Sequence, residues 1–326
     1  MLLEFRIKGF RSILNEVTLS LMAGNGTDVL PLSLVYGANG SGKSSVLSAF
    51  ADLKGRALGR AMRFEPHRLS DGVITYLVYF RRNGKNYGYK LSFSKEIYLS
   101  EELSLQKNGR YEIVFSGKNE KETQARKDFE DLRCFFEDDL VLLSNESDWL
   151  VHSKKIIGKD PRPIVRAFRK LGFSIGNIVL DGDDVYFDYG TFRVPLPDES
   201  YGVRRLFSYI SLIIDALSNG KCIVSDELDS HLHQEVIVQI VREFSSKNGT
   251  GAQLVMATHD TELLAMKEVK KDEVWFTRLS GPERSTELYA LSEFDHLDES
   301  RDYRKEYLGG FYGALPSTGR IFGEDE

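Results

Sequence analysis

The sequence predicts an α/β fold in which a parallel sheet is joined to an antiparallel β subdomain and to a short helical insertion. Three observations support this prediction. A glycine-rich stretch, "GANGSGKS", lies between an apolar run and a helical pattern. Residues 74–116 are rich in β-branched and aromatic residues, with turn residues between the runs. From residue 203 onward, helical and strand patterns alternate, as in parallel sheets with crossover helices.

The composition indicates a globular chain without membrane spans. Of the 326 residues, 41% are hydrophobic, which is enough for a large core. The longest apolar stretch, "LFSYISLIIDAL", has about 12 residues and is too short to cross a bilayer. Two cysteines far apart in sequence, Cys134 and Cys222, favour a reducing, cytoplasmic setting over a disulfide framework. The net charge of −6 gives no overall attraction to nucleic acid, so any DNA contact would need a local patch.

The first elements are expected to be strands. Leu3, Phe5 and Ile7 alternate with polar residues, and residues 17–22 follow the same pattern. Residues 74–116 predict a β meander with an Asn-Gly hairpin turn in "RRNGKN". Residues 119–173 are charged with helical spacing, so we expect a helical insertion there.

A second β-turn-β unit follows in "SIGNIVLDGDDVYFDYGTFRVPL". From residue 203 the predicted order is helix, strand "KCIVS", helix 232–244, strand "AQLVMA", helix and strand "EVWFTRL". This alternation is typical of a parallel α/β sheet.

"GANGSGKS" fits the pattern G-x-x-x-x-G-K-[ST] between a strand and a helix, which is the context that the motif requires. Glycines let the backbone wind around phosphates, so that amide N–H groups point inward. A lysine at this position can bridge the β- and γ-phosphates, and the following hydroxyl can bind Mg²⁺. The candidate nucleotide-binding residues are Gly37, Asn39, Gly40, Ser41, Gly42, Lys43, Ser44 and Ser45.

A second candidate site lies where the apolar strand "CIVSD" ends in two acids. Asp226 can hold Mg²⁺ together with Ser44, and Glu227 can orient and deprotonate an attacking water. The strand "AQLVMA" ends in "THD", where His259 can contact a γ-phosphate. The Asn-Lys-x-Asp stretch that guanine recognition needs is missing, so ATP is favoured over GTP.

Other charged residues have simpler interpretations. His231 and His233 would point in different directions on a helix and are not predicted to bind metal. Asp181, Asp183 and Asp184 lie in a predicted hairpin turn, where aspartate is expected. Two arginine sets have i, i+4, i+7 spacing and are interpreted as solvated helix faces, with DNA or an acidic partner as the alternative: Arg56, Arg60 and Arg63, and Arg162, Arg166 and Arg169.

The ordered set of motifs resembles ATP-binding-cassette ATPases of the SMC and RecF subgroup. It is most similar to the OLD-like AAA-type ATPases of bacterial anti-phage, abortive-infection systems. The residues that carry this resemblance are "KGFRSI", "GANGSGKSS", "ESYGVRRL", "VSDELDSHLH", "ATHDTELL" and "YLGGFYGALP". The resemblance covers both ends of the chain but not the expected helical insertion (119–173). It implies an ABC-type sheet built from an N-terminal ATPase lobe (1–118) and a C-terminal lobe (174–326). The last contains the signature loop, the Walker B strand and the histidine switch.

In this family two chains dimerise head to tail, and each signature loop closes over the ATP of the other chain. The resemblance therefore implies that Ser200 and Gly202, in "ESYGVRR", contact a γ-phosphate across a homodimer or higher oligomer. The alternative is an ordinary helix N-cap at Ser200, and both roles are compatible. The transporter sequence LSGGQ is absent, so coupling to transport is not expected.

Three functions remain open at this stage. The first is a Mg²⁺-dependent ATPase that regulates a separately encoded effector, a nuclease or toxin, in phage defence. The second is a DNA-engaging repair ATPase of the RecF type. The third is a nucleotide-gated scaffold with little turnover. The residues predict the ATPase, and the resemblance implies the biology.

Overall fold

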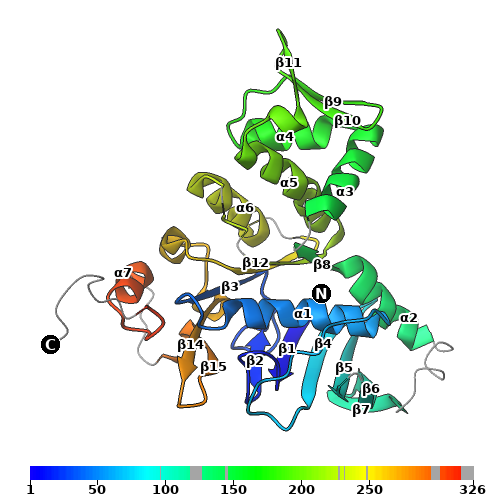
Figure 1. Ribbon diagram of the computed structural model, residues 1–326, viewed down its shortest axis with the longest axis vertical. Helices are drawn as coiled ribbons and strands as arrows, with labels where there is room; N and C mark the ends of the chain where they lie inside the picture. Colours follow the sequence, from blue (N-terminus) through cyan, green and yellow to red (C-terminus); the bar gives the residue numbers. More distant parts are fainter. Residues whose placement is uncertain are drawn as a thin grey trace.

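The computed structural model describes residues 1–95, 97–117, 127–143, 146–226, 228–230, 232–246, 249–294 and 302–316. Two six-stranded sheets and one three-stranded sheet form its framework. The antiparallel sheet lies at one end of the molecule, the parallel sheet is central, and a smaller lobe of helices and short strands stands above it (Figure 1).

The antiparallel sheet has the strand order β2-β1-β4-β5-β6-β7. The predicted N-terminal strands and β meander are confirmed. The turn between β4 and β5 contains Asn83 and Gly84 at φ values of 50° and 74°, as the Asn-Gly hairpin predicts. The strands are β1 (Leu2–Lys8), β2 (Val17–Ser20), β4 (Ile74–Arg82), β5 (Lys85–Ser94), β6 (Ile97–Lys107) and β7 (Arg110–Gly117).

The central sheet has the strand order β15-β14-β3-β13-β12-β8. All neighbouring pairs are parallel except β14 with β15. Every residue of β3 is buried, because both faces of the sheet are covered. The strands are β3 (Leu32–Gly37), β8 (Leu140–Leu143), β12 (Cys222–Asp226), β13 (Gln253–Ala257), β14 (Val274–Ser280) and β15 (Ser285–Ala290).

Helix α1 (Lys43–Ala57) lies between the two large sheets (Figure 1). Its apolar side chains, including Val46 and Phe50, share one core with Phe5 of the antiparallel sheet and Val35 of the central sheet. The other face of the central sheet packs against α5 (Tyr201–Asn219) and α6 (Gln234–Ser246) in a second core. The helix that follows the glycine-rich loop is therefore held from both sides.

The upper lobe contains α3, α4, the first part of α5 and the three-stranded sheet β11-β10-β9 (Figure 1). Phe168, Phe187 and Phe207 pack edge to face and join the helices to this small sheet. The 3-10 helix η3 (Leu196–Asp198) leads into α5. The remaining elements are α3 (Glu146–Lys159), α4 (Arg162–Lys170), β9 (Asn177–Asp181), β10 (Asp184–Asp188) and β11 (Arg193–Pro195).

Two parts of the fold differ from the sequence predictions. The range 119–173 contains a strand as well as helices: α2 (Lys127–Cys134) and the π-helical turn η2 (Phe135–Asp139) lead into β8, which joins the edge of the central sheet. After β13 the chain forms 3-10 turns, η4 (Thr261–Ala265) and η5 (Lys271–Glu273), in place of the predicted helix. The short 3-10 turn η6 (Leu291–Glu293) follows β15, and α7 (Tyr303–Leu308) begins the last described segment.

The interpretation of Arg56, Arg60 and Arg63 as one solvated helix face is wrong. Helix α1 ends at Ala57, before the second member of the set. The Arg56 side chain is buried, pairs with Asp52 at 2.9 Å and lies 3.8 Å above the Phe93 ring. A buried guanidinium needs such partners, so Arg56 joins α1 to the antiparallel sheet and is not available to DNA.

Two predictions from composition concern membranes and cysteines. Within the described ranges, the structure contains no helix with both the length and the apolar character needed to cross a bilayer. Cys134 and Cys222 are both free thiols, and burial raises the pKa of Cys222 to about 12.

Glu273 predicts a pH dependence of folding stability. Its side chain is buried, and this burial raises its pKa from 4.5 to about 7. The folded state therefore binds this proton more tightly than the unfolded state, and the stabilisation is lost as the pH rises from about 4.5 to about 7. Relative to Glu273→Gln, the wild-type thermal midpoint should fall across this window. Glu283 is exposed, so Glu283→Gln is the control and should show the same pH dependence as wild type. A constant difference between the wild-type and Glu273→Gln midpoints across this pH range would contradict the prediction.

Candidate functional site

The glycine-rich loop has the backbone that the motif predicts. Gly37, Gly40 and Gly42 have φ values of 154°, 77° and 109°, which L side chains rarely adopt. A Cβ at Gly37 would lie 2.4 Å from Thr277 Oγ1, and one at Gly42 would lie 2.0 Å from Thr286 Oγ1. A Cβ at Gly40 would meet nothing within 4 Å. The loop is thus packed tightly on its strand side and open at its tip.

Lys43 begins α1 and folds back over the loop. Its Nζ donates hydrogen bonds to the carbonyl oxygens of Gly37 at 2.8 Å and Ala38 at 3.2 Å. The ammonium group is therefore already inside the curve of the loop, where an anion would replace weak carbonyl acceptors. The next residue, Ser44, is exposed beside it.

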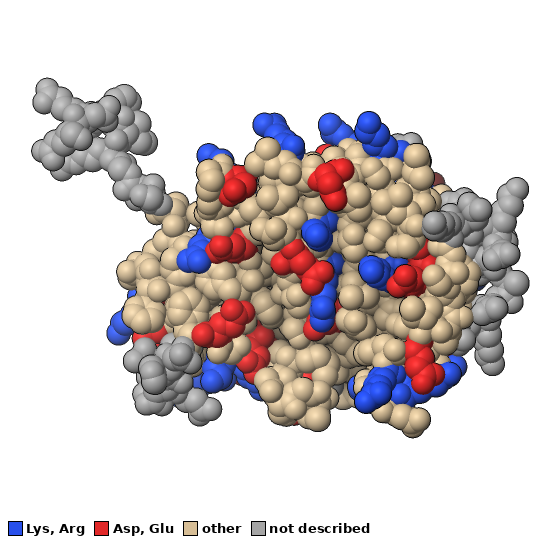
Figure 2. Space-filling model, turned by 90° about the horizontal axis from the view of Figure 1, so that it is seen from below, with Lys and Arg blue, Asp and Glu red and all other residues tan. Residues whose placement is uncertain are grey.

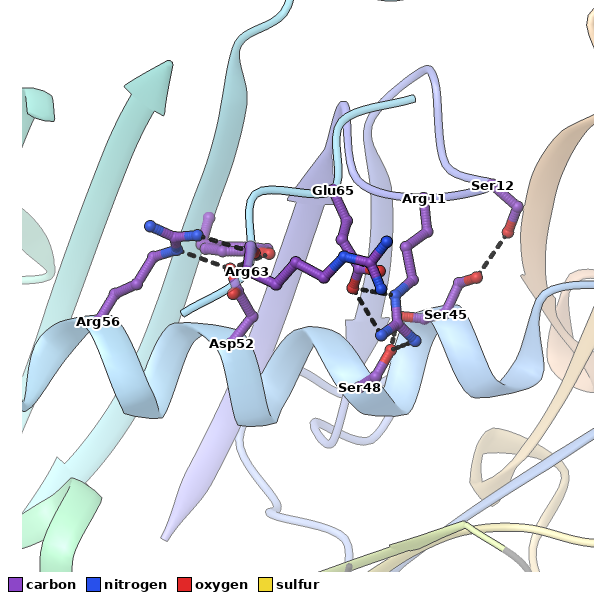
Figure 3. Close-up of polar contacts among 9 residues, drawn as sticks. Arg11, Ser12, Ser45, Ser48, Asp52, Arg56, Arg63 and Glu65 are labelled. Carbon is purple, nitrogen blue, oxygen red and sulfur yellow. Dashed lines mark hydrogen bonds and ion pairs between the residues drawn. The ribbon is translucent and has the colours of Figure 1, made fainter. Parts of the chain in front are cut away.

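Hydroxyl groups from distant parts of the chain support the loop. Ser41 Oγ lies 2.6 Å from Thr277 Oγ1, and Thr286 Oγ1 donates to the Ser41 carbonyl at 3.1 Å. Ser12 Oγ donates to Ser45 Oγ at 2.8 Å and lies 2.7 Å from Thr286 Oγ1 (Figure 3). Sequence reasoning missed Ser12, Thr277 and Thr286, because nothing in their local sequence marks contacts made across more than 230 residues of chain.

The turn after β1 is also tied to α1. Arg11 donates to Ser48 Oγ at 2.8 Å and to Glu65 through Nε at 2.9 Å and Nη2 at 2.7 Å (Figure 3). This gives "KGFRSI" a structural role, since it fixes the first turns of the helix against the β1–β2 connection.

The predicted acidic strand end and the histidine lie at the same edge of the sheet as the loop. In the order β3-β13-β12, the neighbouring parallel strands end in Gly37, Ala257 and Asp226. Asp226 is exposed at the end of β12, and His259 is exposed two residues after β13. Glu227 lies outside the described residues.

The loop after β12 is joined to the loop after β13 by Asp229. Its Oδ2 accepts hydrogen bonds from Thr258 Oγ1 at 2.6 Å and from the His259 amide at 3.3 Å. This carboxylate holds the backbone at His259 in place. Asp229 is the third acid in "SDELD", but the prediction from the acidic strand end used only the first two.

Ser200 is the N-cap of α5, and its Oγ accepts a hydrogen bond from the Val203 amide at 3.3 Å. Helix α5 and helix α1 pack on opposite faces of the central sheet. The structure therefore brings neither Ser200 nor Gly202 to the glycine-rich loop of the same chain, and any contact with a phosphate would be made in a second chain.

The remaining predicted residues have structural roles where they are described. His233 Nδ1 accepts from the Glu235 amide at the start of α6, and His231 lies outside the described residues. The aspartates near the β9–β10 turn flank Gly182 at φ 59°. Among the described residues, no group of three or more His, Cys, Asp or Glu side chains could hold a metal ion.

The arginines of α4 lie on its exposed face, as predicted. Arg162 pairs with Asp160 at 2.8 Å, and Arg169 donates to the carbonyls of Ile175 at 2.8 Å and Gly176 at 2.5 Å. These bonds order the lobe surface.

The family comparison identifies the class of this site. Residues 32–265, more than half of the chain, match the model described as "AAA domain, putative AbiEii toxin, Type IV TA system". The chain belongs to this AAA-domain family. The match includes the glycine-rich loop, the Asp226 strand and the His259 loop, which this AAA-domain protein combines at one sheet edge. No curated protein matches the chain.

Solved structures of SMC heads share the fold of this AAA-domain protein. An SmcHead bound to the C-winged helix domain of ScpA has a TM-score of 0.60 at 14% identity, with 89% of this chain and 97% of that chain covered. A Pyrococcus furiosus head with an extended coiled coil, bound to the C-terminal domain of ScpA, has a TM-score of 0.58 at 12% identity, covering 89% and 96%. The Thermotoga maritima SMC head domain has 0.51 at 15%, covering 89% and 98%. The chain is thus a P-loop ATPase domain of the ABC/SMC type in fold.

The tight packing at Gly42 predicts a difference between two glycine variants. Gly40→Ala should cost about 1–2 kcal/mol of stability, because its φ is positive but its surroundings are open. Gly42→Ala should cost about 1–3 kcal/mol more, because its Cβ collides with Thr286. Thermal unfolding of both variants measures this difference. Equal midpoints would show that Thr286 does not hold the loop.

Proposed function

We propose that the chain is a Mg²⁺-dependent ATPase that dimerises head to tail on ATP and regulates a separately encoded effector in phage defence. The observation that carries the proposal is the glycine loop, with Lys43 folded inside it, at the sheet edge shared by Asp226 and His259. Steady-state phosphate release from ATP, with and without Mg²⁺, tests it. Turnover that does not require Mg²⁺, or an absence of ATP binding, would contradict it.

The residues present fit a bound nucleotide. The loop amides and Lys43 would hold the phosphates, since the ammonium can exchange its carbonyl acceptors for phosphate oxygens. Asn39 and Ser45, which precede and follow the tight turn in the sequence, would extend this surface. Ser44 and Asp226 would hold Mg²⁺, which would neutralise charge on the phosphates when bound. The β-strand that ends at Asp226 leads directly to Glu227, which would deprotonate the water, and His259 would contact the γ-phosphate.

The active form would contain two chains. Ser200 and Gly202 begin a helix whose positive N-terminal end attracts an anion, and α5 lies across the sheet from the loop of its own chain. A head-to-tail homodimer would bring this N-terminus to the phosphate of the other chain. Higher oligomers built on the same contact are compatible with this arrangement.

The proposed effector is a protein partner, a nuclease or a toxin. The family description names a putative toxin of a type IV toxin–antitoxin system, and two of the SMC heads were solved bound to domains of another protein, ScpA. Both support regulation through a partner.

DNA is the second candidate ligand, and the described surface gives it less support. On the face shown in Figure 2, basic and acidic side chains are intermixed, with no broad area of one sign. A protein that binds phosphates along a duplex needs several uncompensated cations on one surface.

Glu227→Gln should bind ATP but hydrolyse it about 10²–10⁴-fold more slowly, because the general base is lost while Lys43 and Asp226 remain. The variant should also accumulate as an ATP-bound dimer in light scattering. Glu235→Gln, an exposed acid in the first turn of α6, is the control and should hydrolyse ATP normally. Wild-type turnover by Glu227→Gln would refute the assignment of the base.

The trans arrangement predicts complementation between two inactive variants. Ser200→Arg should bind ATP but neither dimerise nor hydrolyse it, and Lys43→Ala should lack nucleotide binding. Mixing them should partly restore phosphate release, because one composite site of the mixed dimer then has an intact loop and an intact signature.

Ser200→Ala measures how much the helix cap contributes to stability. It removes the hydrogen bond to Val203, which costs about 1 kcal/mol, without adding bulk at the interface. If the mixed dimer of Ser200→Arg and Lys43→Ala forms and yet releases phosphate no faster than either variant alone, that result would show that Ser200 is a helix cap only.

A further inference from the structure

Tyr36 occupies an unusual position in the fold. It is the residue before Gly37 at the end of β3, and it is fully buried. A phenylalanine would fill the same volume, but the hydroxyl of Tyr36 donates a 2.9 Å hydrogen bond to the carbonyl oxygen of Asp260. Burial raises the pKa of Tyr36 well above its usual value, so this hydroxyl stays protonated and acts as a donor.

Asp260 follows His259, so the hydrogen bond joins the strand that enters the glycine loop to the backbone of the histidine loop. The same short segment is held from two other directions. Asp229 binds Thr258 and the His259 amide, and Gln234 Nε2 donates to Asp260 Oδ1 at 2.8 Å. Strand β3, which leads into the glycine loop, contacts this segment twice: the Val35 carbonyl accepts from the Thr258 amide at 3.1 Å, and the Tyr36 hydroxyl supplies the side-chain contact.

The last described segment of the chain covers the Tyr36 ring from the other side. The Tyr307 ring of α7 lies 5.5 Å from it, and Tyr307 stacks on Phe276 of β14 at 5.7 Å. Tyr312 stacks on the same Phe276 at 5.0 Å. Arg304 of α7 forms an ion pair with Glu262, two residues beyond Asp260. The motif "YLGGFYGALP", which had no assigned role beyond the family resemblance, therefore packs against the ring that carries the hydroxyl.

We propose that Tyr36 is a positioning residue that sets the His259 loop against the glycine loop, with the α7 segment holding its ring in place. This inference rests on the proposed ATPase function. Tyr36 itself would touch neither nucleotide nor water. It would act by keeping the carbonyl of Asp260, and hence the adjacent imidazole, at a fixed distance from the loop that follows its own residue.

Tyr36→Phe tests this role, because it retains the ring and removes only the hydroxyl. The ATP dissociation constant should change less than about twofold, whereas kcat should fall about tenfold or more, since small displacements of a positioned group cost large factors in rate. Tyr89→Phe is the matched control. Tyr89 is equally buried, but its hydroxyl donates at 2.7 Å to Glu101 within the antiparallel sheet and contacts neither the His259 loop nor the α7 segment. This variant should retain wild-type kcat.

Amide hydrogen exchange separates this proposal from the ATPase proposal, since it requires no turnover. Without nucleotide, peptides covering residues 258–262 should exchange faster in Tyr36→Phe than in wild type or Tyr89→Phe. If the wild-type protein does not hydrolyse ATP, the proposed function fails. The exchange result still decides whether Tyr36 holds the His259 loop. Equal exchange in both variants, or equal kcat values in an active enzyme, would overturn the role of Tyr36.

Discussion

The burial of α1 between two sheets is the constraint on which the rest of the structure depends. A phosphate-binding loop must keep its amides aimed at one point, and loops are usually the least restrained parts of a fold. Here the helix that follows the loop is packed from two sides: Phe5 and Val35, from opposite sheets, share one continuous core with its buried residues. The buried Arg56–Asp52 pair adds a directional contact, and Tyr76 Oη donates to the same Asp52 carboxylate at 2.8 Å.

The loop is supported by side-chain hydrogen bonds that small displacements would break. Hydroxyl groups from the turn after β1, from β14 and from β15 form hydrogen bonds around the loop. Two of these hydroxyls lie so close to glycines of the loop that an added Cβ would collide with them. Short hydroxyl contacts in a buried site are sensitive to geometry, and an unpaired partner would cost about 1–3 kcal/mol. The β14–β15 hairpin is therefore part of the support of the glycine-rich loop, although neither of its strands contains a recognisable motif.

Sequence patterns predicted most of the framework but not its edges. Alternation and turn residues predicted the β meander, because those signals are local, as the Asn83–Gly84 turn shows. The strand β8 was missed because "LVLL" is four residues long and follows a charged helix, so no periodicity could distinguish it. Arg56 was misread because its spacing suggested a helix face, whereas α1 ends one residue later and tertiary packing buries the side chain. The glycine loop was readable from its motif, but Asp229, Thr286 and Tyr36 act through contacts that only the folded chain creates.

The strand order of the central sheet has a consequence for biosynthesis. Strand β3 is the first of that sheet to leave the ribosome, yet its two neighbours, β13 and β14, follow more than 200 residues later. At ribosomal rates this interval lasts roughly ten seconds or more. During that time a strand that is entirely buried in the finished fold has no partner on either edge, while the antiparallel sheet and α1 can already assemble beside it. The nascent chain therefore carries an exposed hydrophobic edge until its C-terminal part is made, which makes it a natural client for chaperones acting at the ribosome.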